Sequence, residues 1–174
     1  EMRANKEKQA QNLEADKERQ QFIAQVAALR HQAAERPDAE HLTILEPGGP
    51  QGVTFGELLA ESEAVARGLS SRGVEPRQTV ALMLPTGRDY LFSFLGILMA
   101  GGVPVPIYPP LRPSQLEDHM RRHAAILANA RAVLLITEGR AQQVGRLLKG
   151  QVDSLRTVMT AQQLAGTSAT LERR

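Results

Sequence analysis

Residues 79–106, TVALMLPTGRDYLFSFLGILMAGGVPVP, contain the repeating unit from which the fold is predicted. An apolar run of strand length (79–85) leads into an apolar helical pattern that closes at two glycines. A strand that is apolar throughout is typical of a parallel sheet, because both of its faces are buried. We therefore expect a strand, a helix and a second strand joined by a right-handed crossover, with Thr86 and Asp89 capping the helix.

The second strand of this unit is rich in proline. Pro104 and Pro106 each lack a backbone N–H, and their spacing of two residues turns both missing donors toward the same edge of the strand. Pro109 and Pro110 are expected to hold the exit from the strand in an extended conformation. One interpretation is an edge strand that is protected against aggregation. The other is a rigid loop at the carboxyl end of a strand, where open α/β sheets bind their ligands.

Turn formers and a helix cap mark the segments that precede this unit. Residues 41–45 (HLTIL) form a predicted strand, and the turn-rich residues 46–52 connect it to another, which indicates a β-ribbon. Thr54, with Glu57 three residues later, has the pattern of a capping box. It opens an amphipathic helix that is expected to end near Gly73.

The alternation of strands and helices continues after the prolines. Ser114 and Glu117 form another predicted capping box, and Thr137 is expected to cap a later helix. Further strands are predicted at 132–136 and 156–160. This order predicts an α/β fold with a doubly wound, mostly parallel sheet. The helix after Ser114 is expected to bury one face, made of Leu116, Met120, His123 and Leu127.

We predict three parts of the chain. Residues 1–21 form a charged helical extension or linker, because they have no apolar face to bury; a partner-binding coiled coil is the alternative. Residues 22–160 make up an N-terminal α/β subdomain, which opens with apolar residues at helical spacing until Pro37. Residues 161–174 lose the pattern and are expected to be a tail or linker.

Composition limits the class of protein. The 174 residues, 42% of them hydrophobic, suffice for one domain with a core and are too few for two. The absence of Cys excludes disulfides and cysteine nucleophiles, and favours a cytoplasmic location. Residues 112–174 are basic but lack interleaved aromatic residues, so no nucleic-acid partner is expected. No apolar stretch reaches the roughly 18 residues of a membrane span, and the charged N-terminal residues do not resemble a signal peptide.

Motifs that carry chemistry are scarce. Neither G-x-G-x-x-G, nor the P-loop pattern G-x-x-x-x-G-K-[ST], nor a G-x-S-x-G nucleophile elbow occurs. His119 and His123 have the spacing of two metal ligands on one helix face, but no third ligand is evident, so we interpret them as a surface residue and a packed residue. Glu117 and Asp118 are adjacent and cannot face each other across a substrate. We therefore predict no catalytic, cofactor-binding or metal-binding residue, and the substrate-binding residues stay unknown.

Two motifs, in order, resemble those at the start of the adenylate-forming enzymes. The family's early T-[YF]-x-E-L segment corresponds to Thr54–Leu58, and its alanine-glycine-proline motif corresponds to Leu98–Pro106. The resemblance extends from about Phe22 to Thr160. The closing V-P-[IV]-Y-P-P, Val105–Pro110, looks most like the fatty acyl-AMP ligases, a branch beside the acyl-CoA synthetases and the peptide-synthetase adenylation domains.

The resemblance implies a parent enzyme that activates a fatty acid with ATP and Mg²⁺, forming an acyl adenylate and pyrophosphate. It also implies transfer of the acyl group to the thiol of an acyl carrier protein, with coenzyme A as the alternative acceptor. The family's phosphate loop, adenine-contacting motifs and C-terminal lysine are not found in this sequence. We therefore expect an N-terminal fragment that serves as scaffold, has no activity alone, and self-associates through an unpaired sheet edge. A non-catalytic interaction module with the same fold is the remaining alternative.

Overall fold

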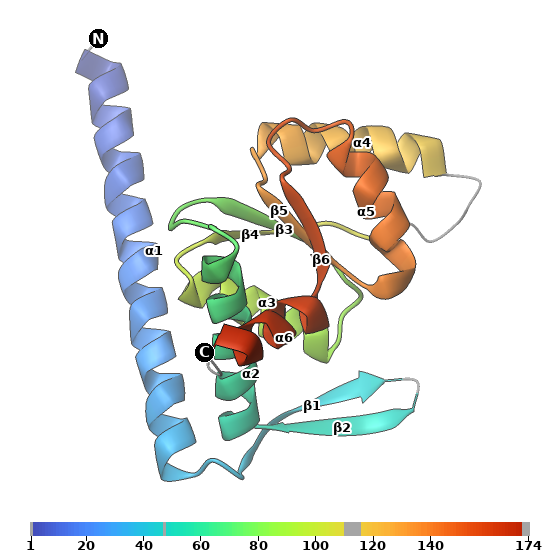
Figure 1. Ribbon diagram of the computed structural model, residues 1–174. Coiled ribbons are helices and arrows are strands. Elements are labelled where there is room, and N and C mark those ends of the chain that lie inside the picture. Colours follow the sequence, from blue (N-terminus) through green and yellow to red (C-terminus); the bar gives the residue numbers. More distant parts are fainter. Residues whose placement is uncertain (1, 47, 110–115, 172–174) are drawn as a thin grey trace.

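The computed structural model consists of a four-stranded parallel sheet between two layers of helices, a two-stranded ribbon and one long helix (Figure 1). It describes residues 2–46, 48–109 and 116–171. Because the strands are parallel and their connections are helical, the predicted α/β fold is confirmed. No helix among the described residues has the length and apolar character that crossing a membrane requires.

The strands of the sheet lie at the predicted places. β3 (Thr79–Met83) is flanked by β4 (Val103–Pro106) and β5 (Leu134–Thr137), and β6 (Thr157–Thr160) pairs with the other side of β5. Every residue of β5 is buried, as are the last four residues of β3. This burial on both faces is what the continuous apolar runs predicted.

Helices cover both faces of the sheet. Alternate side chains of each strand point to opposite faces, so the apolar strands contribute to a core on each side. Val80 and Leu82 of β3 belong to one core, whereas Ala81 and Met83 belong to the other. The first core is covered by α2 (Phe55–Ser71), α3 (Arg88–Met99) and α6 (Ala161–Leu171), and the second by α4 (Leu116–Asn129), the short 3-10 helix η2 (Gly139–Ala141) and α5 (Gln142–Lys149).

α1 (Met2–Glu35) is one continuous helix, so the predicted helical extension and the helix that follows it are a single element. In Figure 1 the N-terminal half of α1 projects beyond the rest of the fold, and its C-terminal part lies beside α2. There, Arg30 forms an ion pair with Glu63, with a nitrogen–oxygen distance of 3.1 Å. Ala33 is buried in the same region, so the apolar spacing of this part of the helix is used for packing.

β1 (Glu40–Glu46) and β2 (Gly49–Thr54) form the predicted antiparallel ribbon. The ribbon packs on the helices through a small separate core that contains Ile44, Val53 and Phe92. The ribbon is therefore joined to the main body through the ends of α2 and α3 rather than through the sheet.

The predicted cap of α2 is confirmed. Thr54 Oγ1 accepts a hydrogen bond from the backbone N–H of Glu57, with a distance of 3.1 Å. On α4, Met120, His123 and Leu127 are buried, as the predicted apolar face requires. The predicted cap at Ser114 and the side chain of Leu116 lie outside what the structure describes.

Two other predicted caps are wrong. α3 begins after Gly87 without a side-chain cap, so Thr86 does not cap it; the Asp89 carboxylate instead accepts a hydrogen bond from Gln162 of α6 at 2.7 Å. Thr137 stays within β5 and is fully buried, and the chain turns only at the next residue. In both cases a contact between elements replaces the local one that the sequence pattern indicates.

Residues 161–171, expected to belong to a tail, form α6, whose Leu164 is fully buried in the sheet core. Gly68 of α2 allows the close approach, because a Cβ there would lie 2.4 Å from the carbonyl oxygen of Leu164. Thr160 and Gln163 form a capping box in which each side chain accepts a hydrogen bond from the other's backbone N–H, at 3.2 and 2.9 Å. The prediction failed because a short helix rich in Ala and Gln is stabilised by tertiary burial more than by its own periodicity.

β4 is the edge strand that the prolines predicted. The backbone N–H groups of Val103 and Ile107 donate to carbonyl oxygens on the β3 side, at 2.9 and 2.8 Å. Because backbone groups alternate along a strand, Pro104 and Pro106 face the outer edge, where no ladder donor is needed. Pro110 lies outside the described residues, so the predicted rigid exit is not described there.

Candidate functional site at the carboxyl edge of the sheet

The connections of the sheet change direction between its two central strands. The chain leaves β3 toward α3 on one face, whereas it leaves β5 toward α5 on the other face. In open α/β sheets, ligands bind outside the carboxyl ends of the strands at such a switch point. The candidate site is therefore the carboxyl edge of β3 and β5, where residues 84–87 and Glu138 leave the strands.

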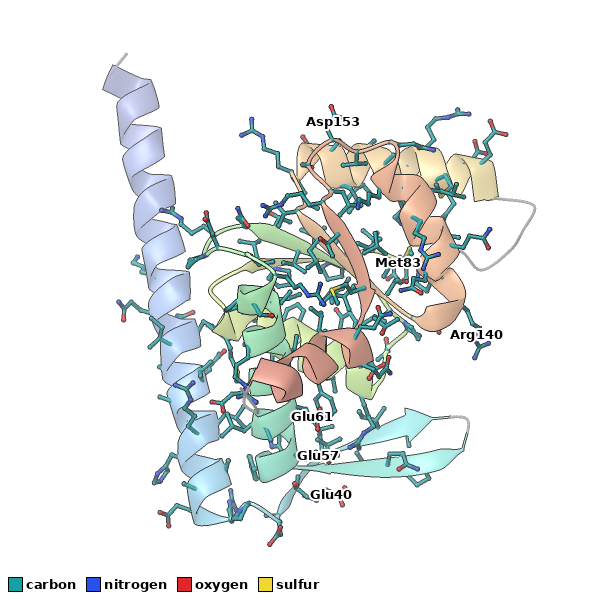
Figure 2. The ribbon with its side chains drawn as sticks, in the orientation of Figure 1. Glu40, Glu57, Glu61, Met83, Arg140 and Asp153 are labelled. Carbon is teal, nitrogen blue, oxygen red and sulfur yellow. The ribbon has the colours of Figure 1, made fainter. Side chains whose placement is uncertain are left out.

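The floor of this edge is buried and joined by a side-chain hydrogen bond. Met83 and Thr137 are the last paired residues of β3 and β5, and Thr137 Oγ1 donates to the carbonyl oxygen of Met83 at 3.3 Å. Both residues are fully buried, and Figure 2 shows Met83 in the interior of the fold. Pro85 and Thr86, close behind in the chain, are exposed. The edge thus combines a rigid uncharged floor with an exposed loop.

Two pairs of polar side chains connect the helices that begin at this edge. Gln162 Nε2 of α6 donates to the Asp89 carboxylate of α3 at 2.7 Å, and Gln142 Nε2 of α5 donates to Gln163 Oε1 of α6 at 3.1 Å. The first turns of α3, α5 and α6 are therefore linked around the carboxyl ends of three strands. Asp89 was predicted from the sequence only as part of a helix cap, and the three glutamines were not predicted; the Thr160-x-x-Gln163 capping pattern was the one local sign of them.

Arg88, the first residue of α3, connects the ribbon to the helices. Its guanidinium forms an ion pair with Glu57 of α2 and donates to the carbonyl oxygen of Gly52 in β2 at 3.1 Å. The same guanidinium lies over the ring of Phe92, 5.4 Å from the ring centroid. Figure 2 shows Glu57 at the lower end of α2, close to the ribbon. These contacts fix the position of the ribbon relative to the start of α3.

The described part of this edge carries hydrogen-bonding groups. Among the described residues, no histidine is hydrogen-bonded to a Ser or Thr hydroxyl, so a nucleophile with an adjacent base is not found there. The structure also groups no three His, Asp or Glu side chains, within its described part, that could hold a metal ion. Hydrogen bonds of this kind can fix the positions of the loops and of the helix N-termini that follow the strands. That this chain contributes no catalytic residue stays a prediction.

The two histidines singled out in the sequence lie together on α4. The ring centroids of His119 and His123 are 3.8 Å apart, and His123 Nδ1 lies 2.8 Å from the carbonyl oxygen of His119. Burial lowers the pKa of both imidazoles, while hydrogen bonds to the backbone at Tyr108 and His119 partly oppose the shift and the nearby Arg122 adds to it. The pair is a packed element of α4 with one partly exposed member, His119.

Glu117 and Asp118 lie on the exposed side of α4. Their carboxylates lie 3.6 and 4.0 Å from the guanidinium of Arg121, and all three side chains are largely exposed. The adjacent acids therefore share one cation on the helix surface. They do not face each other as a pair of carboxylates for acid and base catalysis would.

Comparison with protein families identifies the class of protein. Residues 29–172 match the family described as AMP-binding enzyme, and the chain therefore belongs to this family. The matched region runs from the body-contacting part of α1 through the ribbon, the sheet and both helix layers. The resemblance to adenylate-forming enzymes, inferred from Thr54–Leu58 and Leu98–Pro106, is confirmed.

Relatives of the chain include fatty acyl-AMP ligases. The chain is 33% identical over 114 residues to the long-chain-fatty-acid–AMP ligase FadD26 of Mycobacterium marinum, covering 63% of this chain and 19% of that protein. It is 36% identical over 93 residues to the ligase FadD32 of Mycolicibacterium smegmatis, covering 52% and 14%. It is also 34% identical over 142 residues to a linear gramicidin synthase of Brevibacillus parabrevis, covering 82% and 2%. The chain spans less than a fifth of each of these relatives.

Solved structures share the fold. A fatty acyl-adenylate ligase from L. pneumophila, in complex with acyl adenylate and pyrophosphate, has a TM-score of 0.67 at 23% identity, covering 83% of this chain and 24% of that one. A Mycobacterium tuberculosis fatty acyl CoA synthetase has a TM-score of 0.65 at 22% identity, covering 83% and 28%. The arrangement of sheet and helices is therefore that of an adenylate-forming enzyme.

Proposed function

We propose that this chain forms the first α/β sheet of an enzyme that activates a fatty acid with ATP to give a fatty acyl adenylate and pyrophosphate. The family match over residues 29–172 carries the proposal. The identities of 33% and 36% to two proteins named long-chain-fatty-acid–AMP ligases support the choice of substrate. The order Thr54–Leu58 and then Leu98–Pro106 points to the same class of enzyme.

The described residues do not fit an ATP or Mg²⁺ site by themselves. No glycine-rich phosphate loop occurs in the sequence, and no group of three His, Asp or Glu side chains is present among the described residues. We therefore place the groups that bind ATP and Mg²⁺ in the part of the relatives that this chain does not span. The contribution of this chain is a rigid sheet edge, fixed by Thr137 and by the Gln162–Asp89 and Gln142–Gln163 hydrogen bonds around it.

The acceptor of the acyl group in this proposal is the thiol of an acyl carrier protein. The names of the two ligase relatives favour an enzyme that makes acyl-AMP, and V-P-I-Y-P-P at Val105–Pro110 favours the same branch. Coenzyme A is the second candidate acceptor, because a fatty acyl CoA synthetase shares the fold. We also propose a cytoplasmic location, consistent with the absence of Cys from the sequence.

The test uses the full-length protein that contains this chain. Release of pyrophosphate from ATP is measured with fatty acids of increasing chain length, and acyl-AMP is identified by mass spectrometry. We expect release of pyrophosphate that depends on the fatty acid and on Mg²⁺. If no fatty acid of any chain length stimulates this release, the proposed activity is excluded. Adding coenzyme A or a phosphopantetheinylated carrier protein then shows which thiol receives the acyl group.

The 174-residue chain on its own is proposed to turn over no ATP and to self-associate. Its sheet ends at β6, whose outer edge pairs with no other strand among the described residues. β4 at the other edge carries Pro104 and Pro106, which do not support a further ladder. Light scattering that shows a monomer at every concentration would contradict self-association. If the full-length protein binds partner proteins but does not bind ATP, the alternative of a non-catalytic interaction module is favoured over the enzyme.

A further inference from the structure

His119 and His123 form a pair of neighbouring, mutually tilted imidazoles at the packed side of α4. Their ring planes are inclined by 46°, with the centroids 3.8 Å apart. His123 is only 5% exposed and shares its helix face with Met120 and Leu127, which pack on the sheet. The pair therefore belongs to the contact between α4 and the rest of the fold.

The hydrogen bonds of the pair suit neutral imidazoles. His123 Nδ1 donates to the carbonyl oxygen of His119, an acceptor within the same helix. His119 Nε2 is shielded from water and has no hydrogen-bond partner among the described residues. An added proton on this atom would place an unsatisfied donor and a positive charge in a closed environment.

The other described groups around the pair offset a positive charge only in part. From the sheet, the side chains of this core are apolar, and include Met83 and Leu135. Arg146 and Lys149 are the charged residues of α5, and both are exposed. The backbone of Tyr108, at the exit of β4, hydrogen-bonds His119 and favours its protonated form, but burial is the larger effect and the pKa of His119 stays lowered.

On α4 itself the charge that acts on the pair is positive. Arg122 lies close enough to disfavour protonation of both histidines. Glu117 and Asp118 are engaged with Arg121 on the exposed side of the helix. The charge that acts on both histidines is thus the positive charge of Arg122, and the two acids of α4 are paired with Arg121.

We propose that the His119–His123 pair makes α4 an acid-sensitive element, which separates from the sheet when the imidazoles are protonated. The separation exposes the apolar side of the sheet around Met83 and Leu135. The proposal is independent of the enzyme's substrate.

The direction of the effect follows from the lowered pKa of both groups. The open state, with a histidine pKa of about 6.5, binds protons more readily than the closed state, so acid favours opening. The closed state keeps its full stability above about pH 6.5 and loses it as the pH falls below that value. At pH 5 the opening constant can rise by at most about 30-fold for each histidine, the limit for a group that is never protonated in the closed state.

Hydrogen exchange of the purified 174-residue chain, measured by mass spectrometry at pH 7.5 and pH 5.0, tests the proposal. Exchange is corrected for the intrinsic pH dependence with an unstructured reference peptide. We expect peptides from α4 (Leu116–Asn129) to gain a 10-fold or greater opening constant at pH 5.0, whereas α2 (Phe55–Ser71), which contains no histidine, changes little. An equal change in α2 and α4 would overturn the proposal.

Variants separate the histidines from other acid effects. His123→Leu keeps the site apolar and His119→Gln keeps a polar side chain, and either is expected to reduce the response of α4, with the double variant losing it. His31→Gln, at an exposed position of α1, is the matched control and is expected to keep the full response. A double variant that is folded at pH 7.5 by circular dichroism and still opens at pH 5.0 would disprove the role of the pair. If His123→Leu does not fold, the exchange response of His119→Gln tests the role of the pair, because a substitution at the partly exposed His119 disturbs folding less.

Discussion

Leu164→Ala is the substitution that most directly tests whether α6 belongs to the core. Leu164 is fully buried against the sheet, and α6 approaches α2 so closely at Gly68 that little room exists for the site to collapse. Loss of three buried carbons costs about 2.4 kcal/mol in transfer free energy, and the remaining cavity raises the total to about 3–4 kcal/mol. The expected result is a decrease of that size in the free energy of unfolding.

Urea denaturation of the 174-residue chain, followed by circular dichroism, measures this decrease. Leu147→Ala in α5 is the matched control, because Leu147 is 54% exposed and the same truncation is expected to cost less than about 1 kcal/mol. Leu164→Met keeps the volume and is expected to cost less than about 1.5 kcal/mol. If Leu164→Ala and Leu147→Ala shift the midpoint equally, the placement of α6 in the core is refuted.

Three further substitutions test local features by the same denaturation assay. Arg131 lies just after the C-terminus of α4 with φ +50°, and Gly73 occupies the equivalent position after α2 with φ +72°. Because glycine adopts a positive φ with less strain, Arg131→Gly is expected to raise the free energy of unfolding by about 1 kcal/mol. Thr160→Val removes the side-chain acceptor for the N–H of Gln163 and is expected to cost about 1 kcal/mol, whereas an unchanged midpoint would exclude this cap. Arg88→Gln is expected to lower the free energy of unfolding by about 1 kcal/mol and to speed amide hydrogen exchange in β2 but not in β5. An equal increase of the exchange rate in both strands would contradict the role of Arg88 in holding the ribbon.

Local patterns succeeded where one strand or helix carries its own information. The continuous apolar run of β3 predicted burial on both faces, and the proline spacing in β4 predicted an edge strand, because each follows from the geometry of a single strand. Thr54 predicted the start of α2 for the same reason, since the capping contact spans only three residues.

The patterns failed where contacts between distant residues decide. Thr86 and Thr137 both stand before helices, yet neither caps one, and Asp89 is bound instead by Gln162, 73 residues later in the chain. The candidate site could be placed from sequence only as the carboxyl end of a strand. The polar side chains that surround it, three amides and the Asp89 carboxylate, come from three helices whose positions depend on the sheet.

The sequence alone determined the order of strands and helices up to Thr160, the missing ladder donors on the outer edge of β4, and membership of the adenylate-forming class. Periodicity, proline spacing and short motifs determine these features because they are properties of neighbouring residues. Only the tertiary structure decided that residues 161–171 form a core helix, that Arg88 joins the ribbon to the helices, and that His123 is buried beside the ring of His119. Those features depend on which surfaces are removed from water when the layers pack, and burial of that kind brings together residues that lie far apart in the chain.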